Sequence, residues 1–193
     1  MVQRTVDHDQ RRAEIVRTTW RIIARRGMAG ATMRQIAAEA GFANGALKPY
    51  FPTKADLLMA TYEHVFARTN TRIRELTEDL HGLDALSAVC MEILPLDSVR
   101  LDEGRVVIEF WSEATSDPAA REILVRSVGE WKQLMLSWCQ EIDPDREWNS
   151  RVDALLTFLQ GAQVVGVLAP AVNGSSENLK AQLEEQLAAL IRD

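Results

Sequence analysis

Apolar side chains recur every three or four residues along most of the chain, and no stretch alternates apolar and polar positions as a strand does. This period predicts an all-α protein of about nine helices. The first three are expected at about 9–27, 32–40 and 44–50. The other six are expected at about 54–80, 83–94, 97–116, 118–142, 146–170 and 176–191.

Local signals place the ends of the first two helices. Gly27 follows the last apolar position of the first helix, where a C-terminal glycine is common. Thr32 and Gln35 have the spacing of a capping box, in which the threonine side chain accepts a hydrogen bond from a first-turn amide. Gly41 then ends the second helix after about two turns. We therefore expect a short second helix between two turns.

Charge is divided unevenly along the chain. Residues 1–54 hold ten Lys and Arg against four Asp and Glu, a net charge of +6, and residues 55–193 hold twelve against twenty-four, a net charge of −12. A basic part of this kind is typical of a domain that binds a polyanion, and it also fits a solvated basic surface. We therefore expect a basic domain at 1–54 and an acidic domain at 55–193.

Composition narrows the class of protein. The chain has 193 residues, of which 47 % are hydrophobic, as in ordered globular proteins of one or two domains. The N-terminus has no apolar core of a signal peptide, and the longest apolar run, 164–172, is about half a membrane span. Cys90 and Cys139 have no metal-binding or redox spacing, and their expected role is that of small buried apolar residues. We expect a cytoplasmic protein with no membrane partner, metal or cofactor.

An enzyme would need a nucleophile, a base or a metal site, and the sequence offers none of these. His8, His64 and His81 are dispersed, and no glycine-rich phosphate loop or GxSxG motif is present. Glu109 and Glu113 are explained by one surface of a helix. We therefore expect no catalytic residues.

Ala37, Gly41 and Leu47 have the spacing of a helix-turn-helix, with a small residue at the helix contact, a glycine at the turn and an apolar anchor. Around them, "IVRTTWRIIARRGMAGATMRQIAAEAGFANGALKPYFPTKADLLMATY" at 15–62 resembles the DNA-binding domain of the TetR family of transcriptional regulators. The most specific parts are "RRGMAGATMRQIAAEAG" and the following "G.L..YFPTK..LL". The resemblance implies a homodimer whose third helices enter the DNA major groove about one helical turn apart, roughly 34–36 Å, on a near-palindromic operator.

The resemblance also implies which residues contact DNA. Asn44, Gly45 and Arg34 would face base edges, because an amide can pair with adenine and glycine lets the backbone come close. A helix start, a turn residue and a solvated arginine are the alternative roles of these three. Phosphate contacts are implied for Arg11, Arg12, Thr32, Lys48, Tyr50 and Lys54.

Two positions depart from the family pattern. Lys48 stands where the family usually has tyrosine, and Pro49 where it often has histidine, tyrosine or arginine. Pro49 has no amide hydrogen and its ring clashes with the Gly45 carbonyl, which in a helix interior costs about 3 kcal/mol. We predict that the third helix kinks or tightens there, and that base contacts shift to Ala43–Ala46 and Arg34.

The acidic domain holds candidate residues for binding an effector. "EFWSEATSDPAAREIL", residues 109–124, resembles the corresponding helix turn in the BetI-like branch of the family, whose better-known member responds to choline. Aromatic rings and carboxylates can cage a cation, and glutamines can face the same cavity. Alternatively, the rings are core residues and the glutamates lie on a solvated face. The candidates are Glu109, Phe110, Trp111, Glu113, Trp131, Met135, Gln160 and Gln163.

Apolar positions near the C-terminus predict a dimer interface. By the same resemblance, two helices of each subunit would form a four-helix bundle with their copies. Packing within a single chain is the alternative. The expected interface residues are Val152, Leu155, Leu156, Leu159, Val164, Val167, Leu183 and Leu187.

The function that the resemblance implies is a ligand-responsive repressor. A small-molecule effector of unknown identity would tilt the helix that starts at Lys54 and so change the separation of the two recognition helices. A regulator that binds DNA without a ligand fits the same sequence, and so does an activator.

Overall fold

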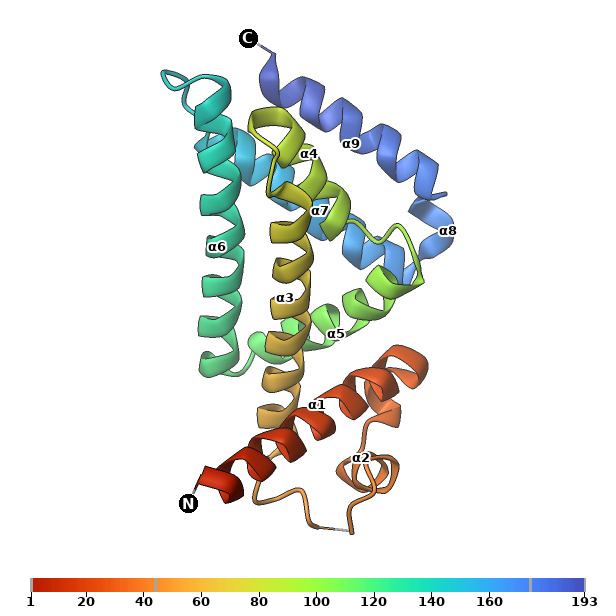
Figure 1. The fold of residues 1–193 in the computed structure, drawn as a ribbon. Coiled ribbons are helices and arrows are strands. Elements are labelled where there is room, and N and C mark those ends of the chain that lie inside the picture. The colour runs from red at the N-terminus through yellow and green to blue at the C-terminus, as the bar shows by residue number, and fades with distance from the viewer. Residues whose placement is uncertain (1, 44, 174, 193) are drawn as a thin grey trace. The chain divides into compact units, whose positions relative to one another are not determined.

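A computed structural model describes residues 2–43, 45–173 and 175–192 (Figure 1). These residues form helices, turns and loops and contain no strand, which confirms the all-α class. The nine helices within them are α1 Val2–Gly30, α2 Met33–Glu39, α3 Lys54–Thr77, α4 Gly82–Ile93, α5 Ser98–Ala114, α6 Pro118–Ile142, α7 Asn149–Leu168, α8 Pro170–Asn173 and α9 Ser176–Ile191.

The helices belong to two compact units. The N-terminal unit consists of the residues up to Phe66 together with Arg105–Arg121, and the C-terminal unit consists of Ala67–Gly104 and the residues from Glu122 onward. Helices α3, α5 and α6 therefore each contribute residues to both units. The domain boundary expected after residue 54 was based on the distribution of charge along the sequence. The two units are instead defined by which residues pack together.

The first helix is longer than its apolar pattern predicts. It begins at Val2 instead of near residue 9, because the residues before the apolar stripe are mostly polar and give no helical period. Its helical conformation is interrupted at Gly27, where φ is 64° and ψ is −178°. The backbone therefore leaves the helix at the glycine that the sequence marked.

Thr32 caps α2 as predicted. Its Oγ1 accepts a hydrogen bond from the backbone amide of Gln35 at 3.1 Å. The Gln35 side chain donates to Glu39 Oε1 at 3.0 Å, so only one half of the capping box forms. The helix ends just before Gly41, whose φ of 75° is accessible to glycine at little cost.

The third helix expected at about 44–50 is not an α-helix in the residues that the structure describes. Residues 45–50 form successive turns, and we call them the recognition segment. The Tyr50 amide donates to the Leu47 carbonyl, three residues back, at 2.9 Å. Hydrogen bonds of this spacing are tighter than those of an α-helix.

Two residues explain why the helix fails. Gly45 has a φ of 83°, far outside the α-helical region. Pro49 has no amide hydrogen, so the Gly45 carbonyl accepts from Lys48 instead, at 3.4 Å. The predicted tightening at Pro49 is present, but the expected α-helix was wrong because two backbone restraints act within five residues.

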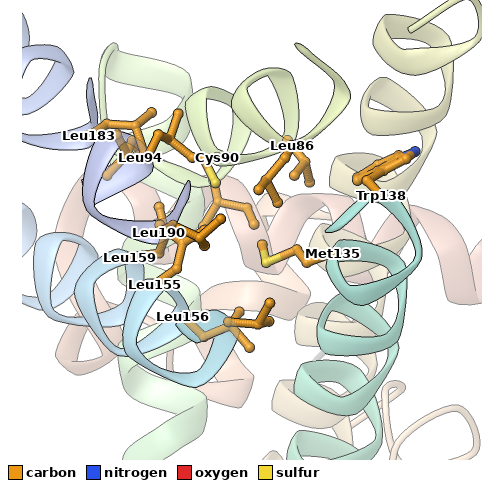
Figure 2. Close-up of a cluster of buried hydrophobic side chains, with 14 of the residues drawn as sticks. Leu86, Cys90, Leu94, Met135, Trp138, Leu155, Leu156, Leu159, Leu183 and Leu190 are labelled. Carbon is orange, nitrogen blue, oxygen red and sulfur yellow. The ribbon is translucent and has the colours of Figure 1, made fainter. Parts of the chain in front are cut away.

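The core of the C-terminal unit is built from α4, α6, α7 and α9 (Figure 2). Leu86 and Cys90 of α4 meet Met135 of α6 and a row of leucines from the other two helices. Fully burying one leucine contributes about 1.5–3 kcal/mol, so this cluster is a main source of the unit's stability. The labelled leucines of α7 and α9 are Leu155, Leu156, Leu159, Leu183 and Leu190.

Both thiols belong to this core. Cys90 and Cys139 are fully buried and neither forms a disulfide. Burial raises the pKa of Cys139 to about 11, and burial together with the neighbouring Cys139 raises the pKa of Cys90. Both side chains therefore stay protonated and act as small apolar residues, as the sequence predicted.

The same core takes up most of the predicted dimer interface. A side chain that is already covered within its own chain has little surface left to bury against a second subunit, so six of these residues pack inside the subunit, and their place at a dimer interface stays a prediction. Val164 and Val167 are partly exposed and are not affected by this argument. The six buried residues are Val152, Leu155, Leu156, Leu159, Leu183 and Leu187.

Candidate nucleic-acid interface and effector residues

The turn after α2 has the side-chain arrangement of a helix-turn-helix. Ala37 and Leu47 are both buried in the N-terminal unit, on either side of Gly41. The Phe42 amide donates to the Ala37 carbonyl at 2.8 Å and closes the turn. The three predicted residues therefore occupy their expected positions, although the recognition segment that follows is not an α-helix.

Aromatic rings hold the end of the recognition segment. Tyr50 stacks on His8 of α1, with ring centroids 4.7 Å apart and planes inclined by 26°. Phe42 meets the Tyr50 ring edge-on, with centroids 5.8 Å apart. These distances fall in the range of favourable aromatic pairs, so Tyr50 is fixed from two sides.

Arg11 and Arg12 also contact rings of this region. The Arg11 guanidinium lies 5.9 Å from the centroid of Phe42, and that of Arg12 lies 4.7 Å from the centroid of Phe51. Arg11 is partly neutralised by Glu14, whose Oε2 accepts its hydrogen bond at 3.1 Å. Both arginines are exposed, so they keep surface on which a phosphate could lie.

The charges of Arg34 and Lys48 have no carboxylate partner, unlike the charge of Arg11, which pairs with Glu14. Both side chains are exposed, and neither makes a hydrogen bond or ion pair with any other described residue. Arg34 lies in the first turn of α2, and Lys48 lies in the recognition segment. They are the predicted DNA contacts best suited to pair with an external anion.

Three of the remaining predicted DNA contacts, Thr32, Gly45 and Lys54, are exposed. Lys54 Nζ donates to the Met28 carbonyl at 3.3 Å. A Cβ added at Gly45 would meet no atom within 4 Å. Asn44 lies outside the described residues. The backbone at Gly45 is therefore open to a close approach, as the sequence suggested.

Four of the predicted effector residues lie on α5 in the N-terminal unit. Phe110 is fully buried and stacks on Tyr62 with centroids 3.9 Å apart, so this face of its ring is occupied. Glu109 and Glu113 are partly buried. Trp111 Nε1 is buried and has no hydrogen-bond partner among the residues described. An unpaired buried donor costs free energy, so an acceptor on a ligand would be favourable there.

The other four predicted effector residues lie in the C-terminal unit. Met135 is part of the apolar core, and the Gln163 amide nitrogen donates to the Ile93 carbonyl at 3.0 Å. Trp131 Nε1 donates to Asn70 Oδ1 at 2.7 Å. Gln160 is partly exposed. Met135 and Gln163 thus act as packing residues in this state, whereas Gln160 remains available.

A buried charged cluster connects α3, α4 and α5 within the C-terminal unit. Arg72 Nε donates to Glu92 Oε1 at 2.6 Å, and its Nη2 donates to Glu103 Oε2 at the same distance. Arg100 donates to the second oxygen of Glu92. The Glu92 side chain is only 1 % exposed, so its charge depends on these two arginines.

The carboxylates of this cluster keep Arg72 in its charged form. Burial alone lowers the pKa of Arg72, but hydrogen bonds and charges of Glu103 and Glu92 outweigh burial and raise it. Sequence reasoning missed the cluster because its members are far apart in the chain. The available signal was Glu92 itself, the one acidic residue in the apolar run "SAVCMEILPL".

The outer face of α7 carries an apolar stripe that is only partly covered, and Phe158 within it also packs against the core. The exposed or partly exposed stripe has helical spacing and continues to Val172 of α8, which is 75 % exposed. An 18-residue window of α7 has a mean hydropathy of 1.2, enough by length and composition alone to cross a membrane, with 39 % of it buried. The stripe consists of Ala154, Phe158, Gly161, Val165 and Leu168.

These features define an all-helical protein with a helix-turn-helix-like N-terminal unit and exposed cations beside it, the architecture of a DNA-binding regulator. The family model described as "Bacterial regulatory proteins, tetR family" matches residues 15–61. A second family model, "BetI-type transcriptional repressor, C-terminal", matches residues 82–192. The chain belongs to the TetR family of transcriptional regulators.

Curated relatives carry the names of regulators and none that of an enzyme. The chain is 36 % identical over 110 residues to the HTH-type transcriptional regulator PksA of Bacillus subtilis (strain 168), covering 56 % of this chain and 54 % of PksA. It is 28 % identical over 118 residues to BetI of Paraburkholderia phymatum, covering 58 % and 59 %. The chain thus spans little more than half the length of the curated relatives that it matches.

A solved structure has the same fold. It is the crystal structure of a regulator from Saccharomonospora viridis in complex with choline, with a TM-score of 0.83 and 22 % identity. The match covers 93 % of this chain and 96 % of that one. At this identity the likeness concerns the fold alone.

Replacing Glu92 by alanine should lower the free energy of unfolding by about 3 kcal/mol, because two arginines lose a buried partner. Asp97 is a matched control, since it also pairs with Arg100 but its side chain is 46 % exposed. Its replacement by alanine also removes the hydrogen bond that Asp97 Oδ1 accepts from the Arg100 amide at the start of α5, and should cost about 1 kcal/mol. Urea denaturation followed by circular dichroism measures both values, and equal losses would show that burial adds nothing to the cluster.

Proposed function

We propose that the protein is a homodimeric repressor that binds a near-palindromic operator and releases it when a small molecule binds. The observation that carries DNA binding is the pair of uncompensated cations, Arg34 and Lys48, together with the open backbone at Gly45. A surface of this kind attracts the phosphate backbone and lets the chain approach base edges. The proposed place of action is the cytoplasm.

The two cations have different roles in this proposal. Lys48 is a flexible point charge on the recognition segment and would pair with a phosphate. Arg34 has a planar fork of donors that suits a guanine edge or a phosphate. Because Pro49 prevents an α-helix in the segment, base contacts would come from its first residues and from α2.

The proposed dimer uses the outer face of α7 in place of the buried leucines. Two copies that pair through this face would cover the apolar stripe from Ala154 to Leu168. Gly161 lies within the stripe and would let the two helices come close. Exposed apolar surface of this extent is uncommon on a monomer and supports a partner of the same chemistry.

The proposed effector is a small organic cation that carries an oxygen acceptor. The partly buried Glu109 and Glu113 favour a positive charge near α5, and the unpaired Trp111 Nε1 favours an acceptor. The choline complex of the related structure supports the choice of choline as the first probe.

A regulator without a ligand is the second candidate. The 3.9 Å stack of Phe110 on Tyr62 and the buried Met135 favour it, because both describe filled space where the sequence suggested a cavity. The two candidates share the DNA contacts and the dimer and differ only in their response to the probe.

The DNA proposal predicts that the protein prefers one duplex over unrelated DNA. That duplex is taken either from directly upstream of its own gene or from a randomised library selected with the wild-type protein. Lys48→Ala should weaken binding to all duplexes and reduce the slope of log affinity against log salt by about one. Arg34→Ala should cost about 1–3 kcal/mol on the preferred duplex. Fluorescence anisotropy at several salt concentrations measures both.

The control for this experiment is Lys180→Ala, which removes an exposed lysine of α9. It should leave affinity and salt slope unchanged. If Lys180→Ala and Lys48→Ala had the same effect, DNA binding would depend on total charge alone.

The dimer proposal predicts that Leu168→Glu makes the protein monomeric, because two charges would then face each other in an apolar contact. Leu168 is 68 % exposed, so the subunit itself should stay folded. Val125→Glu on α6 is the matched control, since Val125 is 67 % exposed and lies off the stripe. Light scattering after gel filtration measures the mass, and a dimeric Leu168→Glu variant would exclude this face.

The effector proposal predicts that saturating choline weakens binding to the preferred duplex at least tenfold, which corresponds to about 1.4 kcal/mol of coupling. Trp111→Phe keeps an aromatic ring but removes the donor, and should weaken choline binding about threefold to tenfold. Calorimetry measures choline binding and anisotropy measures the coupling. Unchanged operator affinity at saturating choline would rule out choline as the effector, and no response to related cations would favour the ligand-independent regulator.

A further inference from the structure

The recognition segment lacks the hydrogen bonds that normally hold a DNA-contacting helix. Its amides bond over three residues, Pro49 donates nothing, and Gly45 has no side chain to restrain it. Leu47 anchors the middle of the segment in the core. Phe51, which directly follows the segment, is also buried, and its amide donates to the Leu47 carbonyl. Between these two anchors, the side-chain contacts of Tyr50 restrain the exposed part of the segment that carries Lys48.

Those contacts come partly from outside the residues that match the family's DNA-binding domain. The family description begins at residue 15, whereas His8 lies in the preceding turns of α1. His8 stacks on one face of Tyr50 at 4.7 Å, and Phe42 meets the same ring edge-on at 5.8 Å. The longer α1 thus brings a ring to the one aromatic residue of the recognition segment.

We propose that His8 is a positioning residue for DNA recognition, which fixes Tyr50 by stacking and so holds Lys48 and Gly45 in place for the operator. The proposal rests on the proposed function, since it assumes that this segment contacts DNA. His8 acts here through its flat ring rather than as a phosphate contact. Loss of one aromatic pair corresponds to about threefold to tenfold in affinity if the pair is needed only for the ordered segment.

The geometry explains why the stack affects the whole segment. The Tyr50 amide donates to the Leu47 carbonyl, and the Phe51 amide donates to the same oxygen, both at 2.9 Å. A Tyr50 ring that left its place would pull on these bonds and on Lys48, which is only two residues away. An ordered loop also binds DNA with a smaller entropy cost than a mobile one.

The test uses the full-length protein with three substitutions of His8. His8→Ala removes the ring, His8→Phe restores a ring without hydrogen-bonding groups, and His8→Lys supplies a charge without a ring. Gln10→Ala is the control, because Gln10 is exposed on the same part of α1. Thermal melting of every variant checks that the fold is kept.

The first measurement is amide hydrogen exchange of residues 45–51 without DNA. His8→Ala should speed exchange of the Tyr50 and Phe51 amides about threefold to tenfold, and His8→Phe should restore the wild-type rate. This result does not depend on DNA binding. Unchanged exchange in His8→Ala would overturn the proposal even if the protein were a repressor.

The second measurement is anisotropy with the preferred duplex and an unrelated duplex of equal length. His8→Ala should lose about threefold to tenfold on the preferred duplex and little on the unrelated one, with the salt slope unchanged. His8→Phe should recover the loss and His8→Lys should not. Recovery by His8→Lys alone would identify a phosphate contact and overturn the positioning role. A wild-type protein with no preferred duplex would contradict the proposed function instead.

Discussion

The N-terminal unit is organised around a backbone segment that cannot form a helix. Gly45 takes a left-handed conformation and Pro49 withholds an amide hydrogen, so six residues that would be a recognition helix become a chain of tight turns. Such turns need external support, because each one supplies fewer and weaker hydrogen bonds than a helical turn. Leu47 supports the segment because it is buried in the core, and the rings of His8 and Phe42 hold Tyr50. One of those rings, His8, lies in the early turns of α1.

A second constraint is that α7 is apolar on two faces. One face fills the core of its own unit against α4, α6 and α9, and the other remains only partly covered in the single chain. An apolar face of this kind favours a partner that covers it. The small residues Ala154 and Gly161 lie on that face, whereas the large buried leucines lie on the other. In the proposed dimer, this division would let one helix serve both folding and assembly.

The sequence predicted most of the fold because helix periods and end signals are local. Gly27, Thr32 and Gly41 each act within a few residues, and each has its predicted role. The hydrophobic periodicity was insufficient where the role of a residue depends on which residues it contacts. It could not tell whether the partner of Leu155 or Leu159 belongs to the same chain, because both arrangements require the same apolar stripe. It could not find the partners of Glu92 either, since Arg72 lies 20 residues away and burial alone makes the pair important.

In the proposed repressor, helix α3 would be the element through which an effector acts on DNA binding. It starts at Lys54, whose ammonium group holds the Met28 carbonyl, and carries Arg72 near its other end. Arg72 is held by Glu92 of α4 and Glu103 of α5, and separating it from them would leave buried charges unpaired. If Glu92 or Glu103 shifted, Arg72 would therefore tend to move with it and would carry α3 along. In the proposed repressor, the charged cluster would make the link between α5 and α3 stiff enough to transmit a small displacement, and the effector's difference in affinity for the two states would set its size.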